Sequence, residues 1–201
     1  QNSRSESAIL LVTFFSTLFL ELEFAIYLGV IISLVFFLQK TSTPEIPTLS
    51  VDTDEKTGKR SLININKKPI KQCPQLKIIR IDMSVYFGSI NHIQQRISNI
   101  ADNERIYHIM IDASGINFID LAGAEALVNE HRMLQKQGGG LYFVGLKSSV
   151  YEFVAKSCFV KKIGPAYFFD SKNEAIHIIY KKLDREICKT CPSQIFKECN
   201  A

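Results

Sequence analysis

The chain has 201 residues, of which 46% are hydrophobic and 22% charged, with a formal net charge of +4. This length fits one domain and an additional element, since domains cluster near about 100–150 residues. The positive charge is small and spread along the chain, which argues against the basic face of a nucleic-acid-binding protein. We expect no nucleic-acid partner. Because the chain begins at Gln1 and not at methionine, we expect it to be a piece of a longer protein.

The first predicted element is the apolar segment Ala8–Leu38, which Glu21 and Glu23 interrupt. A single helix of this length would rise about 46 Å, well beyond the ~30 Å hydrocarbon core of a bilayer. It would also hold both carboxylates inside the membrane, at a cost of roughly 2.5–3.5 kcal/mol each. We therefore expect two short transmembrane helices, near 8–20 and 24–38, with both glutamates marking the break between them.

Interrupted helices of this kind are typical of transporters, where neighbouring helices satisfy the break. Residues 8–40 are accordingly interpreted as last membrane segments, with membrane lipid and upstream transporter helices as their partners. A signal peptide fits poorly, since the basic start and single apolar core are missing. More positive residues follow the segment than precede it, which places the chain after Lys40 in the cytoplasm. The expected location is the cell (inner or plasma) membrane with a cytoplasmic soluble domain.

Residues 41–74 are predicted to be a linker that leads into this soluble domain. Three prolines, Pro44, Pro47 and Pro69, break any sustained period, and the charges between them are mixed. Within the linker, Ser61–Asn66 alternates between apolar and polar residues and predicts one short strand.

Strand and helix patterns alternate over residues 75–186. Predicted strands are LKIIRID, YHIMIDA, LYFVGL and the short YFFD. Between and after them, helical spacing is strongest in the isoleucines at 90, 93, 97 and 100, and a capping-box pattern begins at Ser171. The alternation predicts an α/β fold with a mixed, largely parallel sheet and about four helices. Loops that follow parallel strands gather at one end of such a sheet, where partners or ligands usually bind.

Residues 187–201 form a predicted tail that holds Cys188, Cys191 and Cys199. Five cysteines at irregular spacing argue against a secreted disulfide framework and favour a reducing compartment. The C-x-x-C pair lacks the strand-turn-helix context of a redox motif, and zinc would need a fourth ligand that is not evident near Cys199. We therefore expect a solvated tail with free thiols, no metal and no cofactor, and keep a metal or redox role as the less favoured alternative.

Three segments, FLELEFAIYLGVIISLVFFL, VYFGSINHI and MIDASGINFIDLAGAEAL, together resemble the C-terminal end of a SulP-type anion (sulfate) permease with its STAS domain. The resemblance covers about Ile9–Leu183 and depends on the order of the parts. It implies the C-terminal part of a secondary-active transporter for sulfate, bicarbonate or a related inorganic anion, whose anion site precedes this chain. The small STAS-like domain would have a regulatory, folding or dimerisation role. A homodimer and a regulatory protein at the STAS domain are the implied partners.

The turn NFIDLAGAEAL bears on how such a domain is regulated. In anti-sigma factor antagonists, which share the STAS fold, a serine in this turn is phosphorylated. Alignment on Asp120 and Gly123 places Leu121 and Ala122 at the serine positions, and neither side chain accepts a phosphate. A phosphoryl switch is not expected at this turn.

Asp120 is expected to cap the helix that follows it, which contributes about 1 kcal/mol. The small residues after it let the helix lie close to the sheet and allow contact with a neighbouring domain. We therefore predict that residues 120–123 contact a partner, and that Asp112 and Ser114 order the same loop. Ser114 and Ser84 stay open as phosphorylation sites.

The sequence offers no catalytic residues, and we do not expect an enzyme. His92, His108 and His177 lack a matching nucleophile or carboxylate, and His131 is expected to be a satisfied histidine beside the apolar side of its helix. Gly138–Gly140 follows a helix, whereas a phosphate-binding loop opens one. Two other functions stay open: a partner-switching regulator similar to the anti-sigma factor antagonists, and a weak nucleotide-binding module.

Overall fold

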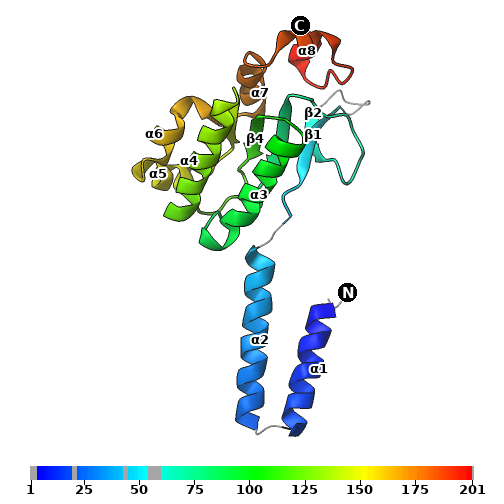
Figure 1. The fold of residues 1–201 in the computed structure, drawn as a ribbon, viewed down its shortest axis with the longest axis vertical. Coiled ribbons are helices and arrows are strands. Elements are labelled where there is room, and N and C mark those ends of the chain that lie inside the picture. Colours follow the sequence, from blue (N-terminus) through cyan, green and yellow to red (C-terminus); the bar gives the residue numbers. More distant parts are fainter. Residues whose placement is uncertain (1–3, 20–21, 43–44, 54–59, 201) are drawn as a thin grey trace. The chain divides into compact units, whose positions relative to one another are not determined.

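The computed structural model describes residues 4–19, 22–42, 45–53 and 60–200. It divides into two compact units, residues 1–44 and 45–201. The first unit is a hairpin of two helices, α1 (Arg4–Phe19) and α2 (Leu22–Ser42), shown in Figure 1. A Cβ atom added at Gly29 of α2 would lie only 3.2 Å from Oγ1 of Thr13 of α1, which shows that the two helices approach closely there.

Apolar side chains are exposed over most of the surface of both helices of the hairpin. Large exposed examples are Leu10, Phe14 and Phe15 on α1, and Phe24, Ile31, Val35 and Phe37 on α2. A helix that is apolar on every side is normally covered by other apolar groups. Among the helices that the structure describes, none is both long enough and apolar enough to cross a membrane.

The two helices are longer than the sequence predicts, and one glutamate lies elsewhere than expected. Glu23 is in the first turn of α2, with its side chain exposed, and so belongs to a helix instead of the break. A carboxylate in this position complements the positive end of the helix dipole. Glu21 lies outside the described residues.

The second unit is built on a six-stranded sheet with the order β2-β1-β3-β4-β5-β6. The strands are β1 (Thr48–Thr53), β2 (Arg60–Asn64), β3 (Leu76–Arg80), β4 (His108–Asp112), β5 (Gly140–Val144) and β6 (Phe168–Phe169). Strands β3 to β6 are parallel, whereas β1 is antiparallel to both β2 and β3. The prediction of a mixed, largely parallel sheet is confirmed.

The prediction of a linker is wrong for residues 48–53, which form β1. Its Thr48 and Leu49 pair with Ile79 and Ile78 of β3, and both are buried. The prolines at 44 and 47 precede this strand and therefore leave its backbone N–H groups free to pair. The short strand expected at 61–66 corresponds to β2.

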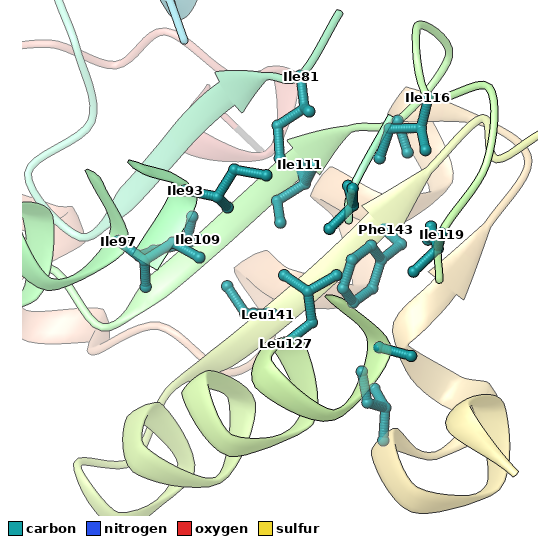
Figure 2. Packing of buried hydrophobic residues seen from close by; sticks show 14 of the residues in the cluster. Ile81, Ile93, Ile97, Ile109, Ile111, Ile116, Ile119, Leu127, Leu141 and Phe143 are labelled. Atoms are coloured by element: carbon teal, nitrogen blue, oxygen red, sulfur yellow. The ribbon is translucent and has the colours of Figure 1, made fainter. Parts of the chain in front are cut away.

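Helices cover both faces of the sheet. They are α3 (Phe87–Asn103), α4 (Leu121–Lys136), α5 (Ser148–Lys156), α6 (Phe159–Ile163), α7 (Lys172–Tyr180) and α8 (Arg185–Thr190). In the larger core, strand residues 109, 111, 141 and 143 face Ile93 and Ile97 of α3 and Leu127 of α4, as Figure 2 shows. The alternate strand residues face α7 and the C-terminal segment in a second core. The sequence predicts four of these helices, and the short helices α6 and α8 are additional.

Candidate functional site

The loop between β4 and α4, residues 113–120, lies at the carboxyl end of β4 and is tied to the connection between β3 and α3. Val85 and Ile119 form a parallel bridge. The N–H of Val85 donates to the carbonyl of Phe118 at 2.9 Å, and the N–H of Asp120 donates to the carbonyl of Val85 at 3.0 Å. These bonds bring the beginnings of α3 and α4 together.

Asp120 binds the N-termini of both helices. Its Oδ1 accepts from the N–H of Gly123 in α4 at 2.7 Å, as the sequence predicts for a cap. Its Oδ2 accepts from the N–H of Phe87, the first residue of α3, at 3.1 Å. One carboxylate thus satisfies free N–H groups at two helix ends, where its negative charge is also favourable. The second cap joins residues 33 apart, and no local sequence signal indicates it.

The four residues predicted to contact a partner differ in their exposure. Leu121 and Ala122 are exposed and Asp120 is half-buried, so these three are accessible. Gly123 is buried, and a Cβ atom there would lie 2.6 Å from the carbonyl oxygen of Val85. Gly123 therefore allows α4 to lie against residue 85 instead of reaching a partner directly.

Large apolar side chains are exposed around Asp120. Phe87 is 79% exposed, Leu121 63% and Phe118 50%, and we name these three residues the apolar rim. The ring of Phe118 lies 6.1 Å from that of Tyr86. The sequence does not indicate two members of the rim, Phe87 and Phe118. Phe87 lies three residues before Ile90, so helical spacing would place it on the buried face.

Asp112 lies at the end of β4 and is 1% exposed. Its Oδ1 accepts from the Ser114 hydroxyl at 2.8 Å and from the Ser114 N–H at 3.3 Å, while Oδ2 accepts from Lys172 Nζ at 2.7 Å. Burial raises the pKa of Asp112, but the hydrogen bonds from Lys172 and Ser114 outweigh it and hold the pKa below its usual value. The ionised carboxylate therefore fixes the start of the loop and joins it to α7.

The two serines that stay open as phosphorylation sites lie close to this loop. Ser114 is exposed, but its hydroxyl donates to the buried Asp112 carboxylate. A phosphate on Ser114 would face that negative charge. The carbonyl of Ser84 accepts from the Ser89 hydroxyl at 3.0 Å and thereby helps to shape the beginning of α3.

His131 lies on the side of α4 that faces the protein interior, and it is fully buried. Its Nδ1 accepts from the N–H of Leu141 at 3.1 Å, and its ring lies edge-on to Tyr167 at 4.4 Å. Burial lowers the pKa of His131 to about 4, so the ring is neutral near pH 7. This histidine joins α4 to β5 and has a structural role.

Residues 66–175 match the STAS domain family. "Probable sulfate transporter 4.2" of Arabidopsis thaliana is 26% identical to the chain over 191 residues, which covers 87% of the chain and 27% of that protein. "Putative sulfate transporter YvdB" of Bacillus subtilis is 24% identical over 173 residues, which covers 85% of the chain and 30% of that protein. The chain thus spans less than a third of the length of these relatives.

The solved structure of the murine solute carrier 26 family member A9 anion transporter, in its inward-facing state, has the same fold. The TM-score is 0.72 at 23% identity, and the match covers 90% of this chain and 29% of that one. The family match covers more than half of the chain, and the relatives are sulfate transporters by name. The chain belongs to the STAS domain family, and over most of its length it is similar to sulfate transporters.

Proposed function

We propose that this chain is the C-terminal part of a secondary-active transporter for sulfate, bicarbonate or a related inorganic anion. The extent of the sequence match carries the proposal. The match to the Arabidopsis protein covers 87% of the chain, more than residues 45–201 make up, so it necessarily includes part of the helical hairpin. A hairpin and a STAS domain that match together favour a permease over an isolated regulatory domain.

The hairpin is the part that we place in the membrane, beside lipid and further transporter helices. Its exposed leucine, isoleucine and phenylalanine side chains support this placement, because apolar groups on every side of a helix are stable only in apolar surroundings. The soluble unit would then lie in the cytoplasm of a cell-membrane protein. Its five thiols and the lysines after residue 40 fit that side.

For the STAS domain we propose a regulatory, folding or dimerisation role through the exposed part of the turn at 120–122 and the apolar rim. Both carboxylate oxygens of Asp120 accept from helix N-termini, so the surface that a partner meets is mainly apolar. Such a surface suits another protein surface, including a second copy of the domain. Leu121 and Ala122 offer no phosphate acceptor, which weakens the alternative of a phosphorylation-driven partner switch.

Two further alternatives receive less support. A nucleotide-binding module would need cations for its phosphates near the strand ends, and two of the cations there, Lys172 and Arg80, already pair with Asp112 and Asp82. An enzyme would need a nucleophile beside an effective base. In the described part of the loop site Ser114 lies beside Asp112, but the lowered pKa of Asp112, which also binds Lys172, makes this carboxylate a weak base. We therefore propose that the protein is not an enzyme.

Transport is tested by reconstituting the complete gene product in proteoliposomes and measuring the uptake of radiolabelled sulfate. We expect uptake above that of protein-free liposomes, and competition by unlabelled sulfate, bicarbonate or chloride would rank the anions. A complete, correctly folded protein that moves none of the three would contradict the proposed function. Membrane placement has a separate readout, because the hairpin should keep the 201-residue chain in the membrane pellet after a carbonate wash.

A further inference from the structure

Four of the five cysteines gather where the C-terminal segment meets the domain. Cys73, in the loop before β3, is buried in the second core, and Cys188 and Cys199 pack against that core. Burial is the largest cause of the raised pKa of Cys73, and the charges of Cys191 and Cys188 raise this pKa further. Burial likewise raises the pKa of Cys188, with added contributions from Cys199 and Cys191. Cys188 thus lies close enough to the other three thiols to affect, or be affected by, their charges.

This grouping corrects two expectations about the C-terminal tail. The tail is not fully solvated, since α8 precedes a segment whose Phe196 is only 2% exposed. A fourth thiol does lie near the other three, but it comes from Cys73, more than a hundred residues earlier in the chain. Within the described part of the chain, no three histidine, cysteine, aspartate or glutamate side chains are arranged to hold a metal ion. The arrangement therefore favours thiol chemistry over metal binding.

Hydrogen bonds fix the loop before β3 against α8 and the segment after it. Gln75 Nε2 donates to the carbonyl of Asp184 at 3.0 Å and to Cys188 Sγ at 3.3 Å, while Gln75 Oε1 accepts from the N–H of Asp184 at 2.9 Å. Lys71 Nζ donates to the carbonyl of Pro192 at 3.0 Å. These contacts between distant parts of the sequence hold the thiols in a defined place.

Cys191 has the surroundings of a reactive thiol. It follows the last residue of α8 and is partly exposed, so solutes can reach it. Burial is the largest single effect and raises its pKa, but the hydrogen bonds from the backbone N–H groups of Gln194 and Ser193 and from the Ser193 hydroxyl, with the charge of Lys71, together outweigh it and lower the pKa. Gln194 has a left-handed backbone with φ of 38°, which is typical of turns whose N–H groups bind an anion. The thiolate is the form that attacks disulfides.

Cys188 is placed to react with Cys191 in a second step. The two residues are three apart at the end of α8, and the N–H of Cys191 donates to the carbonyl of Cys188 at 3.3 Å. Helix geometry puts Cα atoms three residues apart at about 5 Å, which lies inside the roughly 4.4–6.8 Å that a disulfide spans.

We propose that Cys191 and Cys188 form a redox-active dithiol that small-molecule disulfides oxidise, with Cys191 as the attacking thiolate and Cys188 as the resolving thiol. Cys191 Sγ bonds to one sulfur of the reagent and releases the other as a thiolate, which takes up a proton. Cys188 then loses its proton and attacks Cys191 Sγ, and the second thiol of the reagent leaves. Two electrons pass from the protein dithiol to the reagent disulfide, which becomes two thiols. Because Gln75 holds Cys188, the new bond acts directly on the contact between α8 and the loop before β3.

The test is oxidation of the full 201-residue chain, in detergent, by glutathione disulfide at neutral pH, followed by acid quenching, alkylation and peptide mass mapping. We expect a glutathione adduct first at Cys191, then a bond between Cys188 and Cys191 that dithiothreitol reverses. Cys158, which is exposed and apart from the cluster, is the internal reference. The initial rate at Cys191 should exceed that at Cys158 by about threefold or more, because the hydrogen bonds at Cys191 favour the thiolate that attacks the disulfide.

Variants separate the two steps. Cys188→Ser should leave the adduct at Cys191 unresolved, Cys191→Ser should abolish the intramolecular bond, and Cys158→Ser should change neither. Matching thermal unfolding curves establish that each variant is folded. The proposal is overturned if Cys191 reacts no faster than Cys158, or if the bond joins a different pair. Stoichiometric zinc in the reduced chain that is lost in Cys73→Ser would also overturn it, in favour of a metal site.

Discussion

Lys172 places its Nζ 2.7 Å from Oδ2 of Asp112 and so joins the first turn of α7 to the end of β4. The Lys172 side chain is 44% exposed, whereas that of Asp112 is 1% exposed. The two partners are therefore not equivalent. Among the described residues, removal of the lysine leaves the buried carboxylate with only Ser114 as a hydrogen-bond donor, and the desolvation cost of that charge is then poorly offset.

Lys172→Met is expected to lower the free energy of unfolding by roughly 2 kcal/mol at pH 7, the cost of losing a hydrogen bond to a buried charge. The folded-state pKa of Asp112 is lowered, so the contribution of the pair is present above the unfolded pKa of an aspartate and is lost as pH falls through the folded pKa. The difference between variant and wild type should therefore shrink in strong acid. Urea unfolding followed by tyrosine fluorescence measures it. Lys181→Met, at an exposed lysine just after α7, is the control and should have little effect.

Asp120→Ala is expected to destabilise the protein by roughly 2 kcal/mol, since it removes caps from two helices and each cap contributes typically ~1 kcal/mol. Asp184→Ala is a matched control, because Asp184 caps only α8, through the N–H of Glu186 at 2.8 Å. Hydrogen exchange gives a second readout: the amides of Phe87 and Gly123 should both exchange faster in Asp120→Ala. Faster exchange at Gly123 alone would contradict the double cap.

Gly123→Ala is expected to destabilise the protein by about 1–3 kcal/mol, because the added Cβ would lie 2.6 Å from a backbone carbonyl oxygen that cannot rotate away. Ala122→Ser, at the exposed neighbouring position, is the control and should stay within about 0.5 kcal/mol of wild type. Thermal unfolding curves compare the two variants. A Gly123→Ala variant as stable as wild type would mean that α4 can move away from residue 85 at little cost.

His131 should make the protein less stable in mild acid. Its folded-state pKa of about 4 is below that of an unfolded histidine, so the unfolded chain binds the proton more readily, and stability falls as pH decreases from about 6.5 to 4. The contribution of this residue is roughly 2–4 kcal/mol across that range, from about 1.4 kcal/mol per pH unit. Urea unfolding at several pH values should show a flatter dependence in His131→Gln. An unchanged slope in His131→Gln would contradict the assignment of this pH dependence to His131.

Substitution of the apolar rim should separate function from stability. Phe87→Ser combined with Leu121→Ser removes exposed side chains, so the free energy of unfolding should change by less than about 1 kcal/mol. If the rim contacts a partner, self-association or transport by the complete protein should weaken about fivefold or more, the effect of ~1 kcal/mol of binding energy. Met133→Ser, at a 54% exposed apolar residue elsewhere on α4, is the matched control. Equal effects of rim and control variants would argue against a specific contact.

The helices and strands could be predicted because the spacing of apolar residues within each segment shows which positions are buried. The isoleucines at 90, 93, 97 and 100 repeat at helical spacing, and all four are buried on α3. The apolar run of β4 predicts a strand covered on both faces, and every residue of that strand is buried. Strand β1 was missed because nearby prolines favour a connector, although they precede the paired residues.

The features that the sequence did not reveal join residues far apart in the chain. Lys172 meets Asp112 across 60 residues, and Asp120 caps α3 across 33. Cys73 joins the thiols of the tail in the same way. No local pattern identifies such pairs, because they arise only when the crossovers bring separate parts of the chain together at one or the other end of the sheet. The exposure of Phe87 could not be predicted for another reason. Helical spacing shows which face of a helix is apolar, but not how far along the helix that face is covered by the core.

The shared carboxylate of Asp120 has a mechanical consequence. Since α3 and α4 are both pinned to one side chain, a displacement at the start of one is transmitted to the start of the other. A partner that binds Leu121 and displaces the start of α4 would therefore also displace α3. The rigid helix would carry this displacement to Ile100 near its other end.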